Sequence, residues 1–355
     1  MKAQHVSTQK VDPNGGNRVW RWRKFSLLVQ LRAMLTTISL FSLIVIISVV
    51  LLTQGKTPIP LSQLVTALFM PDQAGFIAEI IWNIRLPRVL TAVFAGAALG
   101  ISGAIFQSIS RNPLGSPDVI GFTTGAASGA IAWLVFIGPN ITGVLIATLA
   151  GGLLTALAVY WLTLRQGQID SYRLVLIGIG VGSTLSALNG LMLVKGNLDN
   201  AMLANLWLAG SLNARNWAHA LPVMMGILLL SPFIVAFARS LSMTEMGDDL
   251  AKQLGVSVES SRKFMTLLGV LLAALATGAV GPIAFIALAA PQLAKRLGRQ
   301  HQVSVVGSAA MGACLLLCAD LVTQQLPGQL VLPIGRMTAI IGGLYLLWLL
   351  TRPRR

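Results

Sequence analysis

Residues 119–164 read VIGFTTGAASGAIAWLVFIGPNITGVLIATLAGGLLTALAVYWLTL and contain no charged side chain. A helix that crosses a membrane needs about 20 apolar residues, so this stretch is long enough for two such helices. Gly138-Pro139-Asn140 lies near its middle and is a strong turn signal. The stretch therefore predicts two membrane-spanning helices that are joined by a short turn.

The same pattern continues on both sides of this stretch. Further charge-free runs occupy 33–55, 89–110, 174–194, 216–238, 264–294 and 300–319, and a last apolar run extends from about 332 to 350. The run 264–294 contains Gly278 and Gly281-Pro282, so it predicts one full helix and one short or tilted helix. The sequence thus predicts an all-α integral membrane protein with ten transmembrane helices.

The overall composition supports this fold class. Hydrophobic residues make up 55% of the 355 residues and charged residues only 10%, whereas soluble domains carry about 25% charged residues. The net charge of +15 could suggest a nucleic-acid partner. The basic residues, however, lie at the edges of the apolar runs, which is the pattern of membrane topology and excludes a nucleic-acid-binding domain.

The distribution of Lys and Arg sets the orientation. With both termini cytoplasmic, 20 of the 26 Lys and Arg residues fall on cytoplasmic segments, and six fall on outer segments: Lys56, Arg85, Arg88, Lys195, Arg215 and Arg336. This asymmetry follows the positive-inside rule. Residues 1–32 are polar and basic, and we expect a disordered cytoplasmic tail there. Residues 33–352 are expected to form a single permease domain.

The spans lack the groups that membrane-embedded chemistry needs. Asp320 is the one carboxylate within a predicted span, and its position at the end of that span indicates a polar residue near the outer interface, with an ion-coupling role as the alternative. The spans hold no nucleophile–base pair and no metal-ligand cluster, so we expect neither an enzyme nor a bound metal or cofactor. Cys314 and Cys318 are interpreted as packing residues, with a disulfide or metal role as the alternative.

Small residues recur at a spacing of four. Gly96 and Gly100 form one such pair, and Gly178 and Gly182 form another. Glycines at this spacing allow two helices to approach closely in lipid, so we expect tight helix packing at both pairs. Contact with a transported substrate is the alternative interpretation.

The cytoplasmic segment between the sixth and seventh spans predicts a short amphipathic helix over 242–255. Ser242 and Glu245 have the spacing of a capping box, and Gly255 is a typical stop. Four apolar residues fall on one face of this helix: Met243, Met246, Leu250 and Leu254. Such a face either lies in the lipid interface or docks in a groove on a partner protein. The acidic residues beside it favour the partner, because an anionic inner leaflet repels them.

Arg85 and Arg88 run against the charge bias, because they lie on the outer side. They flank Leu86-Pro87, and the proline suits the first turn of the following helix. From the pattern alone, both arginines are interfacial anchors whose side chains extend to the lipid headgroups.

Four blocks of the sequence resemble the iron-chelate uptake permeases, the membrane subunits of type II ABC importers for ferric siderophores, haem and vitamin B12. The blocks are RLPRVLTAVFAGAALGISGAIFQSISRNPLGSPDVIGFTTGAASG (85–129), EMGDDLAKQLGVSVESSR (245–262), GPIAFIALAAPQLAKRL (281–297) and LPIGRMTAIIGG (332–343). They occur in the order and spacing of the family. SPDVIGF, LWLAGSLN (206–213) and the second block are most similar to the members that import ferric enterobactin.

The resemblance implies a multi-pass bacterial inner-membrane permease without a cofactor. In this family two permease subunits form the channel, two cytoplasmic ATPase subunits hydrolyse ATP, and a periplasmic binding protein delivers the chelate. The second block matches the segment that docks on the ATPase: Glu245, Met246, Gly247, Asp248, Asp249, Leu250, Ala251, Leu254 and Gly255. Arg85 and Arg88 match the arginines that meet the binding protein, and Asp170, Ser171 and Tyr172 match the cytoplasmic gate.

The resemblance predicts a ferric siderophore as the substrate, a catecholate such as ferric enterobactin, and a heterodimer of two different permeases. The alternatives are another iron chelate, haem or vitamin B12, a secondary transporter without an ATPase, and a structural or receptor-like membrane protein. The chain departs from the family at Gln292, where a histidine is usual, and at Gln324-Gln325, where relatives carry an arginine.

Overall fold

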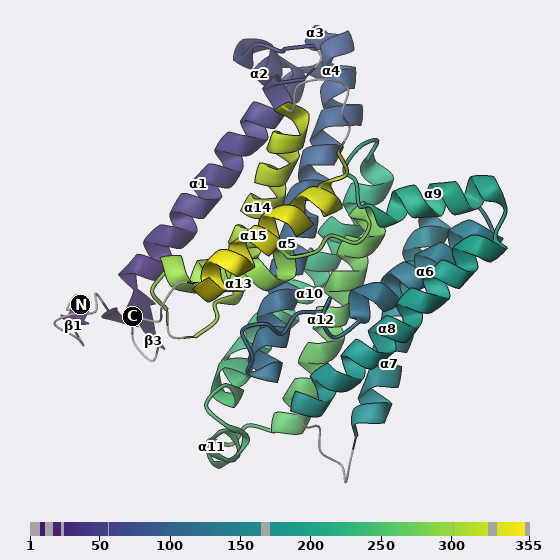
Figure 1. The fold of residues 1–355 in the computed structure, drawn as a ribbon. Coiled ribbons are helices and arrows are strands. Elements are labelled where there is room, and N and C mark those ends of the chain that lie inside the picture. Colours follow the sequence, from purple (N-terminus) through teal and green to yellow (C-terminus); the bar gives the residue numbers. More distant parts are fainter. Residues whose placement is uncertain are drawn as a thin grey trace.

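The structure is a computed structural model that describes residues 8–10, 17–22, 25–55, 57–164, 171–300, 302–325 and 332–351. Helices account for most of these residues (Figure 1). In chain order they are α1 (Leu31–Thr53), α2 (Leu61–Phe69), α3 (Pro71–Ala74), α4 (Phe76–Ile80), the π-helical turn η1 (Ile81–Arg85), α5 (Leu86–Ser110), α6 (Phe122–Phe136), α7 (Ile141–Thr163), α8 (Ser171–Lys195), α9 (Leu198–Leu208), α10 (Trp217–Thr244), α11 (Asp248–Gln253), α12 (Val258–Val280), α13 (Ile286–Leu297), α14 (Val305–Gln325) and α15 (Ile334–Thr351).

Seven helical segments within the described residues are long and apolar enough to cross a membrane. They are Leu31–Thr53, Phe76–Ser110, Ile141–Thr163, Tyr172–Lys195, Trp217–Thr244, Val258–Val280 and Val305–Gln325. The other three predicted spans correspond to the shorter helices α6 with 15 residues, α13 with 12 and α15 with 18. The all-α membrane fold is confirmed, whereas the count of ten spans is not.

The predicted division of 264–294 into a full and a short helix is confirmed. α12 ends at Val280, and Gly281 follows with φ +80°, a conformation that glycine adopts readily. Pro282 lacks a backbone N–H, which helps to end the helix. α13 begins at Ile286 and has only 12 residues, so it cannot cross a hydrocarbon core of about 30 Å by itself.

Helix α5 is the centre of the bundle. It packs against α10, α12, α13 and α14, and most of its residues from Ala92 to Ser110 are buried. In lipid, the apolar surface of a helix gives little driving force for association, so close packing of small side chains takes that role. The sequence of α5 fits this position because Gly, Ala and Ser are frequent in it.

The predicted close packing at both glycine pairs is confirmed. A Cβ atom at Gly96 would lie 2.5 Å from the Gly312 carbonyl oxygen, and one at Gly100 would overlap the Ser308 carbonyl. These contacts hold α5 against α14. A Cβ atom at Gly178 would lie 2.6 Å from the Ile120 carbonyl oxygen. Any larger residue at these sites forces the backbones apart.

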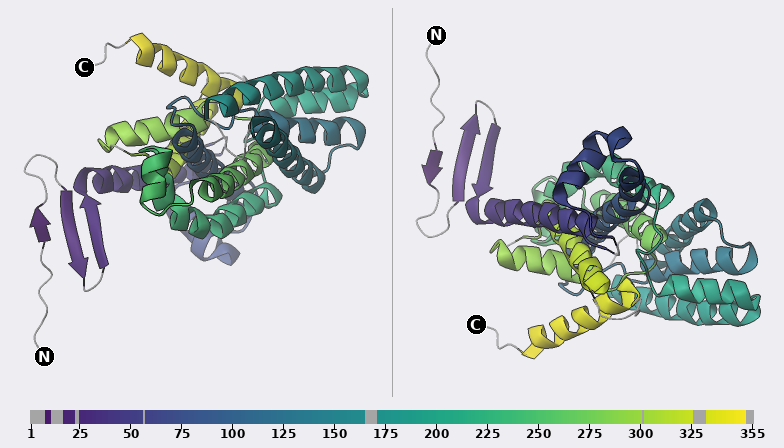
Figure 2. Two further views of the ribbon diagram at one scale, coloured as in Figure 1. Left: turned by 90° about the horizontal axis from the view of Figure 1, so that it is seen from below. Right: turned by 90° about the horizontal axis from the view of Figure 1, so that it is seen from above.

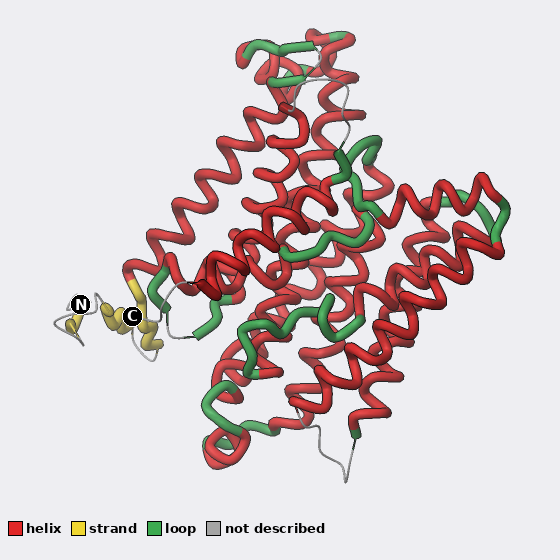
Figure 3. The backbone as a smooth tube through the Cα atoms, viewed as in Figure 1, coloured by secondary structure: helices red, strands yellow, loops and turns green. Residues whose placement is uncertain are grey.

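The connection 111–121 returns into the protein instead of remaining at the end of the bundle (Figure 3). Ser116, Pro117 and Ile120 within it are buried. Gly121 has φ +84° and lies against Gly178 and Gly182 of α8, where a Cβ atom would meet backbone at 2.8–3.1 Å. This loop therefore places the start of α6 inside the helix bundle.

Some elements were not expected from the sequence. α2, α3 and α4 form a cap at one end of the bundle, and α9 lies across its side (Figure 1). Their apolar runs are shorter than a span, so both regions were expected to be outer loops. α11 lies at the opposite end of the bundle from the cap (Figure 1).

The N-terminal segment differs from the expected disordered tail. Three antiparallel strands, β1 (Thr8–Lys10), β2 (Asn17–Trp22) and β3 (Phe25–Gln30), form a small sheet beside the start of α1 (Figure 2). Within it Asn17 pairs with Gln30 and Trp22 with Phe25. The physical reason is that NRVWRW and FSLLVQ contain aromatic residues and valine, which favour strands. The expectation of disorder rested on the polar and basic residues of this segment and did not take these side chains into account.

The orientation of the chain is open to a direct test. We expect a cytoplasm-active reporter fused after Arg355 to be active, and a periplasm-active reporter inserted between 195 and 215 to be active, because 20 of 26 basic residues then lie inside. Each fusion is compared with the converse reporter at the same site. Activity of the periplasmic reporter at the C-terminus would contradict the predicted topology.

Candidate functional site

The segment that precedes α11 is the main correction to the predicted sites. Ser242, Met243 and Thr244 belong to the last turn of α10, and α11 begins at Asp248 rather than at 242. Ser242 does not cap a helix, because its hydroxyl donates to the Ala238 carbonyl one turn earlier. The reason is that α10 continues past Arg239 to Thr244. The long side chain of Arg239 can reach water although its backbone remains helical, so the arginine does not mark the end of the helix. Gly247, with φ +121°, makes the break.

The predicted apolar face is present on the outside of this segment. Met246, Leu250 and Leu254 are 58%, 49% and 60% exposed, whereas Ala251 on the opposite side is fully buried. Three neighbouring apolar side chains at the end of the bundle remain uncovered by the described part of the chain. Such a patch is typical of a docking surface for another protein.

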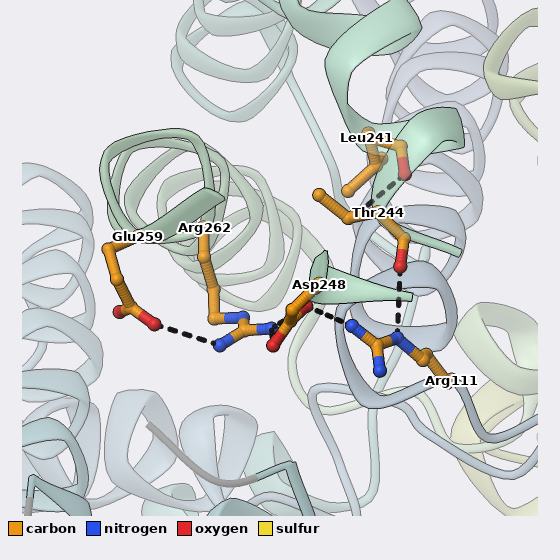
Figure 4. Close-up of polar contacts among 6 residues, drawn as sticks. All are labelled: Arg111, Leu241, Thr244, Asp248, Glu259 and Arg262. Atoms are coloured by element: carbon orange, nitrogen blue, oxygen red, sulfur yellow. Dashed lines mark hydrogen bonds and ion pairs between the residues drawn. The ribbon is translucent and has the colours of Figure 1, made fainter. Parts of the chain in front are cut away.

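A cluster of charged side chains fixes this segment to two long helices (Figure 4). Asp248 at the start of α11 pairs with Arg111, which follows α5, and with Arg262 of α12, whose Nη2 atom lies 3.0 Å from the carboxylate. Arg262 is only 5% exposed and also contacts Glu259 at 3.3 Å. Arg111 Nε donates to the Thr244 carbonyl at 2.9 Å and so satisfies the end of α10.

Glu245 provides a further link to α5. Its carboxylate accepts a hydrogen bond of 2.5 Å from the Ser108 hydroxyl. Glu245, Asp248 and their partners therefore connect the exposed apolar face to α5, α10 and α12.

Arg85, the last residue of η1, holds the chain next to α1. Its guanidinium donates to the Leu52 carbonyl at 2.6 Å and to the Thr57 carbonyl at 2.5 Å. The last carbonyls of a helix have no partner within the helix, so this side chain satisfies the end of α1. Arg85 is half-buried and carries its charge at the cap formed by α2 to α4.

Arg88 lies one turn further along and has a different environment. Its Nη2 atom lies 2.6 Å from Asp320 of α14, and its Nε donates to the other carboxylate oxygen at 3.2 Å. Asp320 is fully buried and also accepts from Gln324 at 2.9 Å. Asp320 is therefore the buried half of an ion pair, a contact that its interpretation as a polar residue near the outer interface did not include. Its partner is 232 residues away in the sequence.

The remaining predicted sites are distributed over the molecule. Asp170 lies outside the described residues, Ser171 begins α8, and Tyr172 is 71% exposed near the start of that helix. Cys314 and Cys318 are free thiols in α14, and Cys314 is buried. Gln292, at the departure from the family pattern, donates to the Gln107 side chain at 2.6 Å and so joins α13 to α5.

A cavity that sequence reasoning did not identify lies beside α9. Its volume is about 340 Å³. It is lined by Asp118 and Thr123 at one side, by Asn205 and Leu208 of α9, and by Arg336 near the start of α15, together with Thr124, Ala209, Pro282, Ile283, Ala284, Gly335 and Ala339. Asp118 lies outside the spanning helices. Burial raises its pKa to about 6, and a hydrogen bond from Thr123 opposes that shift.

Comparison with known proteins gives consistent results. Residues 41–352 match the FecCD transport family. The chain is 44% identical to the ferric enterobactin transport system permease protein FepG of Escherichia coli (strain K12), over 93% of this chain and 99% of that protein. It is 35% identical to the achromobactin transport system permease protein CbrC of Dickeya dadantii (strain 3937), over 95% and 97% of the two chains.

A solved structure has the same fold. A metal-chelate type ABC transporter in an inward-facing conformation superposes with a TM-score of 0.78 at 29% identity, over 88% of this chain and 98% of that chain.

Proposed function

The chain belongs to the FecCD transport family and is the permease of an ABC iron-chelate importer in the bacterial inner membrane; from this premise we propose that it carries a ferric catecholate such as ferric enterobactin into the cytoplasm. The observation that supports this substrate most directly is the 44% identity, along nearly the whole chain, to a ferric enterobactin permease. The energy comes from ATP hydrolysis in a separate partner, and this subunit carries out transport, not catalysis.

The α11 segment is the proposed docking site for that ATPase. Glu245 to Gly255 place Met246, Leu250 and Leu254 in solvent, where a groove on the ATPase can cover them. The ion cluster around Asp248 supports the role, because it connects this surface to α5 and α12. Two such ATPase subunits serve the two permeases of one importer.

A second, different permease is the proposed partner at the face of α8 and α15. The outward side of α8 carries several small and hydroxyl residues, namely Gly180, Ser183, Thr184, Ser186 and Gly190, among larger apolar ones such as Ile179 and Leu188. Nothing lies within 4 Å of a Cβ atom placed at Gly180, Gly190 or Gly343. A lipid-facing helix favours large apolar residues, whereas small ones allow another helix to approach. Ser171 and Tyr172 of the proposed gate are the first residues of α8, which carries this face.

Arg85 and Arg88 are the proposed contacts for a periplasmic binding protein. Both guanidinium groups lie near the cap at the outer end, and Arg side chains suit carboxylates on a partner. Arg88 already binds Asp320 through Nε and Nη2, so only its other N–H groups are available to the partner. Arg85 is bound by carbonyls, which leave its positive charge uncompensated.

We expect Arg85→Gln to weaken association with the binding protein by up to about fivefold, since a rim-exposed charge pair contributes about 0.2–1 kcal/mol. The neutral amide removes the charge, and membrane insertion of the variant is compared with that of wild type. Association is measured with purified importer in nanodiscs at two salt concentrations. Unchanged affinity and salt dependence would show that Arg85 only anchors α1.

The proposed function is tested by reconstitution with the ATPase and the binding protein of the same system. We expect uptake of ⁵⁵Fe-labelled tricatecholate into proteoliposomes to require ATP and to persist when the proton gradient is dissipated. Uptake of ferric hydroxamates, haem and vitamin B12 is measured in the same proteoliposomes, and preferred uptake of one of them would identify it as the substrate instead. Uptake that needs the proton gradient and no ATP would establish a secondary transporter instead.

A further inference from the structure

The cavity beside α9 is lined by one basic side chain, Arg336, and by one acidic side chain, Asp118, which form no ion pair with each other. Among the residues that the structure describes, no carboxylate lies within 4 Å of the Arg336 guanidinium. We propose that this cavity is an anion-binding subsite on the transport pathway, in which Arg336 binds one catecholate arm of the iron chelate. The inference rests on the proposed function and adds the residue that selects the substrate by charge.

Arg336 is the third residue of α15 and is exposed. It shares the lining of the cavity with Asn205 and Leu208 of α9. Charged side chains in membrane-spanning helices are rare and usually face a polar cavity or a pathway. Asp118 lines the same cavity, and burial raises its pKa to about 6. The raised pKa increases the share of neutral carboxyl, which does not repel a bound anion.

The chemistry of the lining suits a catecholate. Arg336, Asn205 and Thr124 bring guanidinium, amide and hydroxyl donors to one cavity, and Arg336 and Asn205 are exposed at its mouth. Three doubly deprotonated catecholates around Fe³⁺ form a trianion, whose oxygens accept from a planar guanidinium. The described residues contain no cluster of three or more His, Cys, Asp or Glu side chains that could take the iron. The site therefore recognises the organic shell.

The volume decides how much of the chelate enters. About 340 Å³ is at the small end of ligand pockets, which measure about 300–1,000 Å³. One aromatic arm fits this space, and the remainder of the chelate lies outside the mouth between α9 and α15. This mouth is next to the face proposed for the second permease, so the subsite faces the pathway between the two subunits.

The test uses the assembled importer in proteoliposomes with saturating chelate-loaded binding protein. Uptake of ⁵⁵Fe-tricatecholate and ATP hydrolysis are measured together for wild type, Arg336→Gln, Arg336→Lys and the control Lys195→Gln. The control removes one positive charge at the outer end of α8, outside the cavity. We expect Arg336→Gln to lower uptake per ATP hydrolysed about tenfold with ATPase activity unchanged. Arg336→Lys keeps the charge and should show a smaller fall.

Three results would overturn the inference: an unchanged ratio for Arg336→Gln, an equal fall for Lys195→Gln, or parallel loss of uptake and ATPase activity in both Arg336 variants. If Arg336→Gln does not assemble, the test is made with Asn205→Ala. A lower uptake per ATP hydrolysed in that variant would support the subsite, and an unchanged value would contradict it. Wild-type importer that carries only a neutral chelate refutes the anion subsite alone. Wild type that carries no iron chelate refutes the proposed function itself.

Discussion

Leu250→Asp should release the ATPase from the permease. The side chain is 49% exposed at the centre of the apolar face of α11, between Met246 and Leu254. Burial of a leucine in the ATPase groove contributes about 1.5–3 kcal/mol, and a carboxylate there lacks a partner. We therefore expect the affinity for the ATPase to fall about ten- to hundredfold. Co-purification from membranes and ATP-dependent uptake both report the loss.

The matched control is Leu250→Met, which keeps an apolar side chain of similar volume and should retain the ATPase. Membrane insertion of both variants is compared by protease protection, since position 250 contacts solvent and not the bundle core. Full ATPase co-purification and normal uptake with Leu250→Asp would show that α11 lies against lipid headgroups and not in a protein groove.

The second large effect is expected at the ion pair between α5 and α14. Arg88→Leu leaves the fully buried carboxylate of Asp320 without its cation. Removing one partner of a buried pair costs about 3–5 kcal/mol, because the remaining charge is left without compensation. We expect a loss of that size in the free energy of unfolding, measured by steric trapping in bicelles. Uptake should fall with the folded fraction.

The double variant Arg88→Leu/Asp320→Leu separates stability from binding-protein docking. Replacing both charges with apolar groups is often neutral or stabilising, so most of the lost stability should return. If the double variant is as unstable as Arg88→Leu alone, the pair does not stabilise the fold in the way described. A stable double variant with impaired uptake would assign Arg88 a direct contact with the binding protein.

The sequence predicted best those features that depend on local pattern. The predicted apolar run 33–55 became α1 (Leu31–Thr53), and the turn at Gly138 to Asn140 separates α6 from α7 as expected. The glycine pairs also predicted close helix packing from the local sequence alone. Only a residue without a side chain allows the backbone contact between Gly100 and Ser308. Apolar runs predict helices reliably in a membrane protein, because the backbone N–H and C=O groups of a spanning segment must form hydrogen bonds within that segment.

Features that depend on distant contacts could not be predicted in this way. The ion pair of Arg88 with Asp320 and the contact of Arg111 with Asp248 join residues more than 130 positions apart. The cavity beside α9 draws its lining from four separate segments. The end of α10 was placed too early because a single arginine suggested an interface, although a cation is favourable near the C-terminus of a helix.

The length of α6 has a consequence for how the chain enters the membrane. Fifteen residues rise about 22 Å, which is less than the hydrocarbon thickness of about 30 Å. As this segment leaves the ribosome it partitions only weakly into lipid by itself, and Gly121, which precedes it, still lacks the α8 backbone on which it rests. We therefore expect α6 to stay at the translocon with α7 until α8 has been synthesised, so that these three helices enter the bilayer together.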